Sequence, residues 1–246
     1  MTSEFRVGRF QILPLVVKNL LIINGLFFLA TYAFHLPRID IDLNDIFGLH
    51  FIAASKFRFY QLVTYMFMHG SISHIILNMF ALWMFGSALE SFWGAKRFLL
   101  YYFVTGIGAG LLQEITWAIE LRDVLLPHIE MINLGGYELI PKADFLDRLV
   151  TVGASGSVYG LLLAFGMIFP NAVIYIYFLF PMKAKWFVIL YGAIELFSGI
   201  TGTNDGIAHF AHLGGMIFGF FLILYWKNQA KRKIKRMQEQ YYFSQT

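Results

Sequence analysis

The 246-residue chain contains no cysteine, and only 14% of its residues are charged. The absence of cysteine excludes disulfide bonds, thiolate nucleophiles and cysteine-ligated metal centres. With 58% hydrophobic residues and a mean hydropathy of +0.63, the chain lacks the polar residues needed to cover a water-exposed surface. It also lacks a P-loop, a dinucleotide-binding fingerprint and an internal repeat. The composition therefore predicts a polytopic membrane protein.

Six apolar segments approach or exceed the length of about 20 residues that a helix needs to cross a bilayer. They cover residues 12–34, 63–88, 97–119, 150–169, 184–200 and 207–226. The start of the fifth is open, because the apolar stretch 172–181 is either part of that helix or a separate interfacial piece. We predict an all-α fold, with a bundle of six transmembrane helices over residues 1–226 and a basic cytoplasmic tail over 227–246.

Basic residues in short loops predict the orientation of these segments. Lysine and arginine flank the first segment and follow the second, fourth and sixth, whereas the loop 120–149 is net acidic. Both termini are therefore expected on the cytoplasmic side, and the second, fourth and sixth segments begin at the extracytoplasmic side. A stop-transfer anchor at the lipid surface explains the basic tail, and we expect no nucleic-acid partner.

Polar residues capable of chemistry lie near the start of three of these segments. They are His74 and Asn78 in the second, Ser155 and Tyr159 in the fourth, and His212 in the sixth. Ionisable residues are costly inside a membrane, so we interpret these side chains as functional. The common direction of the three segments places them in one layer near the extracytoplasmic face.

Helical spacing assigns some of these residues to common faces. His74 and Asn78 are four residues apart and share a face, whereas His69 lies about 140° round the helix from His74. We therefore expect His69 to have a different role. Ser155 and Tyr159 are also one turn apart, which puts an aromatic ring beneath the hydroxyl, where it can orient an imidazole.

Small residues on the fourth and sixth segments favour close helix packing. The pairs are Gly156 with Gly160 and Gly215 with Gly219. We predict that the two helices touch there, which would bring Ser155 within the roughly 2.6–3.2 Å of His212 that proton transfer needs. The turn Gly153-Ala154-Ser155-Gly156 also puts the Ser155 amide at a helix N-terminus, which favours an oxyanion.

A carboxylate that would complete a catalytic triad is not evident in the sequence. Asp205 precedes His212 by seven residues but is expected in an outer loop. Glu114 and Glu195 lie near the outer ends of their helices, where the cost of a carboxylate is low, and we interpret both as structural groups. The pattern predicts a Ser155–His212 dyad.

Taken together, three motifs resemble the rhomboid family of intramembrane serine proteases. They are the run from His69 to Asn78 (HGSISHIILN), the run GASG at 153–156 with Tyr159, and the run AHLGG at 211–215 with Gly219. The similarity covers residues 58–226. It implies a serine endopeptidase that needs no cofactor or metal and cleaves single-pass membrane proteins near the extracytoplasmic side. The bacterial type that it resembles implies a bacterial inner membrane.

The resemblance also implies a role for each matched residue. Ser155 is the expected nucleophile, His212 the general base, and His74 and Asn78 with the Ser155 amide the oxyanion hole. The supporting residues are expected to be Tyr159, which stacks on His212, the structural His69, and Gly153, Gly156, Gly215 and Gly219. Glu90 resembles the acidic residue that closes the cytoplasmic end of the second helix. The fifth helix carries no expected catalytic group and is the likeliest movable wall.

Two other functions are compatible with parts of the sequence. A catalytically inactive rhomboid-like binder of membrane helices would be favoured by loss of Ser155 or His212, and both are present. A metal transporter or metalloprotease would use four histidines: His69, His74, His209 and His212. The divergence of His69 from His74 and the absence of a His-Glu-x-x-His motif argue against this metal site.

Overall fold

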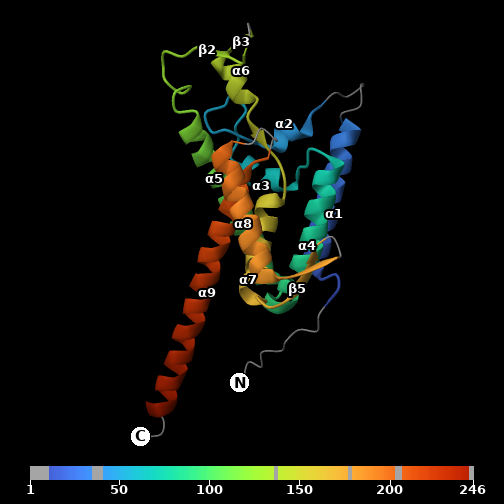
Figure 1. Cartoon of the computed structure of the whole chain (residues 1–246), viewed down its shortest axis with the longest axis vertical. Coiled ribbons are helices and arrows are strands. Elements are labelled where there is room, and N and C mark those ends of the chain that lie inside the picture. The colour runs from blue at the N-terminus through green and yellow to red at the C-terminus, as the bar shows by residue number, and fades with distance from the viewer. Residues whose placement is uncertain (1–10, 35–40, 136–137, 177–178, 203–206, 244–246) are drawn as a thin grey trace.

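The computed structural model describes residues 11–34, 41–135, 138–176, 179–202 and 207–243, and it is a bundle of helices (Figure 1). The long helices are α1 (Leu15–Phe34), α4 (Ile72–Trp93), α5 (Ala95–Glu120), α8 (Ala184–Thr201) and α9 (His209–Phe243). These five are long and apolar enough to cross a membrane. The predicted fold class, a polytopic helical bundle, is confirmed.

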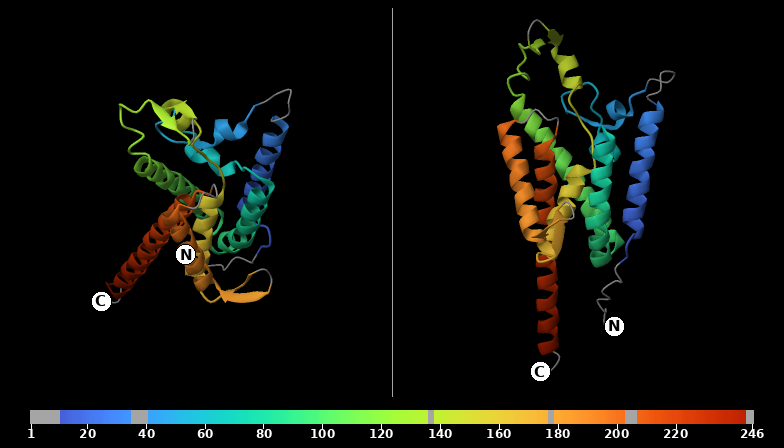
Figure 2. Two further views of the ribbon diagram at one scale, coloured as in Figure 1. Left: turned by 45° about the horizontal axis from the view of Figure 1, so that its top comes forward. Right: turned by 45° about the vertical axis from the view of Figure 1, so that its right-hand side comes forward.

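The fourth predicted segment forms α7 (Ser155–Ile168), which has only 14 residues. At 1.5 Å per residue it is about 21 Å long, shorter than a hydrocarbon core of about 30 Å. It lies in the middle of the bundle and packs against α4, α5, α8 and α9 (Figure 2). The protein surrounds this short helix, and six crossings with cytoplasmic termini remain a prediction.

The second predicted segment is not one continuous helix. Its first part forms the short helices α3 (Gln61–Thr64) and η1 (Tyr65–Phe67), and α4 begins only at Ile72. The Ser71 hydroxyl caps α4 by accepting a hydrogen bond from the His74 amide at 3.2 Å, the usual role of serine at this position. His69 therefore precedes α4, and the helical offset predicted between His69 and His74 is wrong.

Glu90 ties α1 to the end of α4. Its carboxylate accepts hydrogen bonds from the Val16 and Val17 amides at 3.0 and 2.8 Å, which are among the first amides of α1 and lack helical partners. Gly94, with φ +79°, then separates α4 from α5.

Glycines set the spacing of α5, α7 and α9. A Cβ added to Gly215 of α9 would overlap the backbone carbonyl of Gly156 in α7, so these two helices touch as predicted. Gly160 and Gly219 instead face α5, where an added Cβ would meet Thr105 or Tyr101. The second glycine of each predicted pair therefore admits a third helix to the contact.

The connection between α5 and α7 is folded onto the first connection. It contains the antiparallel strands β2 (Met131–Asn133) and β3 (Leu139–Pro141), the helix α6 (Lys142–Asp147) and β4 (Val150–Thr151). β4 pairs with β1 (Leu49–His50), which follows α2 (Leu43–Phe47). These elements lie together at the top of Figure 1.

Two further segments differ from the predicted boundaries. The apolar stretch before α8 forms the antiparallel strands β5 (Val173–Ile176) and β6 (Phe180–Lys183), and so is separate from that helix. α9 continues without a break past residue 226, the predicted end of the membrane domain, and its last part projects from the bundle (Figure 2).

Candidate active site

Ser155 and His212 meet where α7 and α9 approach most closely. The Ser155 Oγ lies 2.8 Å from the His212 Nε2, within hydrogen-bonding distance. Ser155 is the first residue of α7, and Gly215, one turn after His212, lies against the backbone of Gly156. The close helix contact therefore holds the hydroxyl against the imidazole.

The ring of Tyr159 lies flat against the imidazole of His212. Their centroids are 4.2 Å apart and their planes differ by 10°. Tyr159 is one turn after Ser155 on α7, so a single helix supplies both the hydroxyl and the stacking ring. The Tyr159 hydroxyl extends beyond the imidazole and donates a hydrogen bond to the carboxylate of Glu195.

Glu195 of α8 is part of this cluster. Its Oε2 lies 3.0 Å from the Nδ1 of His212 and 2.7 Å from the Nδ1 of His209, and the residue is only 5% exposed. Glu195 is hydrogen-bonded, as predicted for a structural group, but its partners belong to the site, so α8 does bring a polar side chain to His212. Asp205, the other carboxylate considered, lies outside the described residues.

Gly153 separates His74 from Ser155. Its φ is +134°, and a Cβ added there would lie 2.7 Å from the His74 Nε2 and 3.4 Å from the Ser155 Oγ. The imidazole and the hydroxyl therefore lie beside the same backbone position. The Gly153 amide donates to the Tyr65 carbonyl at 2.9 Å, which fixes the turn before α7. Only glycine combines this positive φ with the close approach of His74.

Asn78 is buried on α4, one turn after His74. Its Nδ2 donates a hydrogen bond to the His74 carbonyl at 2.9 Å. Among the described residues no hydrogen bond joins it to Ser155, but the amide group has a second N–H. The first amides of α7 also lack helical acceptors, so the start of α7 offers donors next to Ser155.

His69 lies against His74 rather than away from it. The ring centroids are 5.0 Å apart and the rings meet edge to face, and His69 is 1% exposed. The turn between η1 and α4 brings the two rings together, which a continuous helix would not do. The predicted divergence of the two histidines is thus wrong, and His69 is positioned to support His74 from the side away from solvent.

Glu195, His209 and His212 also form the kind of group that binds a metal ion. One ligand atom from each lies within 4.8 Å of the others, and imidazole and carboxylate are zinc ligands. In the geometry described, the His212 Nε2 contacts Ser155, and the Glu195 carboxylate accepts from Tyr159 and lies at hydrogen-bonding distance from His209. This is the geometry of a hydrogen-bonded cluster.

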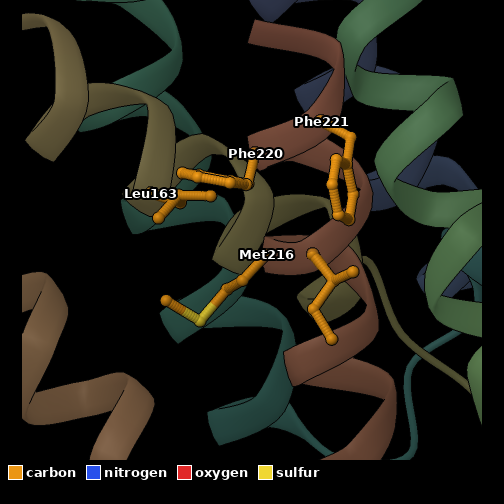
Figure 3. Close-up of a pocket in the computed structure, with 5 residues that line it drawn as sticks. Leu163, Met216, Phe220 and Phe221 are labelled. Atoms are coloured by element: carbon orange, nitrogen blue, oxygen red, sulfur yellow. The ribbon is translucent and has the colours of Figure 1, made fainter. Parts of the chain in front are cut away.

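An apolar pocket of roughly 440 Å³ lies between α7 and α9, and none of these polar groups lines it (Figure 3). It is lined by Leu163, Met216, Ile217, Phe220 and Phe221. These side chains provide no acid, base or nucleophile, so the chemistry of the site rests on the cluster around Ser155.

Comparison with known proteins identifies the family. Residues 56–229 match the Rhomboid domain. Over 164 residues the chain is 30% identical to RHOMBOID-like protein 6, mitochondrial, of Arabidopsis thaliana, a match covering 66% of this chain and 42% of that protein. It is 29% identical over 177 residues to Rhomboid protein 1, mitochondrial, of Saccharomyces cerevisiae, covering 70% and 43% of the two proteins.

A rhomboid protein of Bacillus subtilis is 28% identical over 173 residues, and there the match covers 70% of this chain and 69% of the relative. The chain thus spans less than half the length of the plant and yeast relatives. The matched region contains every residue of the cluster around Ser155. By its sequence and its helical bundle, the chain belongs to the rhomboid family.

Proposed function

We propose that this protein is an intramembrane serine endopeptidase in which Ser155 is the nucleophile and His212 the general base. The observation that carries the proposal is the 2.8 Å contact between the Ser155 Oγ and the His212 Nε2. A serine hydroxyl is a weak nucleophile until a neighbouring base accepts its proton. Membership of a family that generally consists of intramembrane serine proteases supports the same chemistry.

The reaction proceeds in two stages. The Ser155 Oγ attacks the carbonyl carbon of the substrate peptide while its proton moves to the His212 Nε2. As the C–N bond breaks, the same proton passes to the leaving amine, and the acyl group stays on Ser155. A water molecule then loses a proton to His212 and attacks the acyl carbon, which releases the carboxylic acid and restores the serine.

Each tetrahedral intermediate carries a negative oxygen that needs hydrogen-bond donors. We assign this role to His74, Asn78 and the Ser155 amide. The proximity of the His74 Nε2 and the Ser155 Oγ to Gly153 supports the first, and the position of Ser155 at the start of α7 supports the last. Donors of this kind, fixed before the reaction, stabilise the transition state.

We infer that the substrates are single-pass membrane proteins cleaved near the extracytoplasmic side. Five helices long and apolar enough to cross a membrane support substrates that lie in the membrane, and the predicted orientation puts the N-terminal ends of α7 and α9, which carry Ser155 and His212, toward the extracytoplasmic side. The names of the plant and yeast relatives place them in mitochondria, so the comparisons lend no support to a bacterial inner membrane for this integral membrane protein.

The test is cleavage of a generic single-pass substrate by the purified protein in liposomes. Wild type is expected to release one discrete product and Ser155→Ala none, with a melting temperature close to wild type, because the substitution removes only a hydroxyl. A fluorophosphonate should label wild type at Ser155 in the same preparation. Cleavage by Ser155→Ala at the wild-type rate would show that the nucleophile is another group.

The same assay separates the two other candidate functions. A catalytically inactive binder would retain the substrate helix without cutting it, and wild type would behave like Ser155→Ala. Glu195, His209 and His212 lie close enough together to bind one metal ion, which is the observation that favours a metalloprotease. A metalloprotease would lose activity in EDTA and recover it with zinc, whereas the serine mechanism predicts unchanged cleavage in EDTA.

A further inference from the structure

We infer that Glu195 is a positioning residue that completes a Ser155–His212–Glu195 triad. The inference rests on the proposed function, since it describes how the base of that reaction is held. Three helices then build the site: α7 supplies the serine, α9 the histidine and α8 the carboxylate.

The first argument is the geometry around His212. Its Nε2 faces Ser155 at 2.8 Å, and its Nδ1 lies 3.0 Å from the Glu195 Oε2. That second contact is of ion-pair length but lies away from the Nδ1–H direction, and no other described group hydrogen-bonds Nδ1. A carboxylate is an acceptor only, so it keeps the proton on Nδ1 and leaves Nε2 free to accept.

The second argument is charge. When His212 takes the proton of Ser155 the imidazole becomes a cation, although His212 is only 8% exposed. A buried cation needs a counter-charge, and interactions between charges are stronger here than in water. Glu195 is the acidic residue that contacts the ring among the described residues, and it is also buried. Its carboxylate therefore stabilises the form of His212 that exists during catalysis.

The third argument is that the carboxylate is itself held in place. The Tyr159 hydroxyl donates to Oε1, and the His209 Nδ1 lies 2.7 Å from Oε2. Two donors fix its orientation and reduce the cost of burying its charge. Tyr159 thereby contacts the imidazole with its ring and the carboxylate with its hydroxyl. A residue serving only helix packing would not need oriented contacts on both oxygens.

The test compares wild type with Glu195→Gln, Glu195→Asp and a matched control, Glu114→Gln, in one detergent and with one single-pass substrate. Glu114 is the carboxyl group of α5 that accepts a hydrogen bond from the Ile52 amide at 2.8 Å, so Glu114→Gln makes the same carboxyl-to-amide change in another helix without touching His212. The measurements are kcat, KM, melting temperature and the pH dependence of kcat.

Glu195→Gln should lower kcat by about 10²- to 10⁴-fold, because the amide can donate to Nδ1 and so favour the wrong tautomer. KM and melting temperature should change little. Without the carboxylate the imidazolium forms less readily, so the acid limb of the pH–rate profile should move to lower pH. The titratable groups facing His212 are His74 of α4, Tyr159 of α7, Glu195 of α8 and His209 of α9, and the variant alters one of them.

Glu195→Asp keeps the charge on a shorter side chain and should recover part of kcat, and Glu114→Gln should match wild type. Wild-type kcat with an unmoved acid limb in Glu195→Gln would overturn the inference, as would an equal loss in Glu114→Gln. If the Glu195 variants do not fold, the inference can be tested on wild type by ¹⁵N NMR of the histidine rings. The signals of His212 are assigned by their loss in His212→Ala, and they report which ring nitrogen carries the proton. The inference requires the proton of neutral His212 on Nδ1, and a proton on Nε2 would refute it.

The outcomes also distinguish this inference from the proposed function. Failure of wild type to cleave any substrate, or full activity of Ser155→Ala, would remove the protease assignment itself. Cleavage by wild type, none by Ser155→Ala and full turnover by Glu195→Gln would leave the protease and its dyad in place and remove only the role of Glu195.

Discussion

Gly215 of α9 lies directly against the backbone of Gly156 in α7, with no room for a side chain between them. The contact is one residue from Ser155 along α7 and three from His212 along α9. Because backbone atoms cannot move aside as a flexible side chain can, the distance between the two helices at this point fixes the distance between hydroxyl and imidazole.

Gly215→Ala should therefore separate α7 from α9 and weaken the contact between Ser155 and His212. We expect kcat to fall by about 10²-fold or more, since a misplacement of about 1 Å has that effect on an aligned site, together with a lower melting temperature. Gly25→Ala is the matched control, because Gly25 lies on α1 and an added Cβ meets no atom within 4 Å. Equal activities of the two variants would contradict this explanation.

Gly153→Ala tests the position beside His74. The substitution places a Cβ 2.7 Å from the His74 Nε2 and also forces alanine to adopt a φ of +134°. We expect loss of most turnover, because His74 must move away from Ser155. Gly202→Ala is the control for backbone strain without a steric clash. The φ of Gly202 is +64°, and an added Cβ meets nothing within 4 Å. That control should lose about 1–2 kcal/mol of stability and keep its activity per folded molecule.

The sequence motifs predict part of the cluster around Ser155, namely the contact with His212 and the stacking of Tyr159 on its ring. The length of an apolar segment depends only on the local sequence, so hydropathy predicts most ends of the long helices to within a few residues. The late start of α4 was missed because residues 61–71 are as apolar as a helix, and only the cap formed by Ser71 and the preceding short helices reveal the break.

Glu195 was missed for a different reason. It belongs to α8 and His212 to α9, 17 residues later, and no helical spacing relates residues on two helices. Its one signal in the sequence was a carboxylate inside an apolar segment, which is expensive unless it has partners. Near the end of a membrane helix a carboxylate costs little, so this signal does not distinguish a structural glutamate from one that contacts the site.

Asp147 should anchor the connection 120–149 to the first connection. Its carboxylate accepts hydrogen bonds from the Ser55 amide and hydroxyl at 2.7 and 2.6 Å and from the Lys56 amide at 3.3 Å. Burial opposes ionisation, but these hydrogen bonds outweigh it and lower the pKa of Asp147 below its ordinary 3.8. The stabilisation is therefore complete above pH 3.8 and is lost as the pH falls through the lower pKa of the folded protein.

Asp147→Asn should accordingly lower the melting temperature at pH 7 by about 1–2 °C, a small effect for one exposed contact in a chain of this size. The difference from wild type should shrink as the pH falls below 3.8. Asp144→Asn, on the exposed side of the same helix α6, is the control and should show no difference at either pH. A pH-independent effect of Asp147→Asn would mean that the carboxylate charge is not what anchors the loop.

Asn78→Ala tests whether oxyanion stabilisation is separate from nucleophile activation. The change removes one donor and leaves the contact of Ser155 with His212 intact. It should lower kcat by roughly 10²-fold, the scale for loss of one such donor, with little change in KM. Asn78→Asp should be worse, because its negative charge would repel the developing oxyanion. Fluorophosphonate labelling of Ser155 should slow in both variants, since the adduct carries a similar charged oxygen.

His69→Ala is the counterpart on the same part of the chain. His69 is buried against His74, so its truncation leaves a cavity beside the His74 ring and removes no donor from the oxyanion hole. We expect a lower melting temperature and substantial kcat in the folded fraction. Measured together, the variants give opposite patterns, with Asn78→Ala losing turnover and His69→Ala losing stability. Full kcat in Asn78→Ala would show that Asn78 is not part of the oxyanion hole. Loss of all turnover in a stably folded His69→Ala variant would show that His69 affects the reaction through His74.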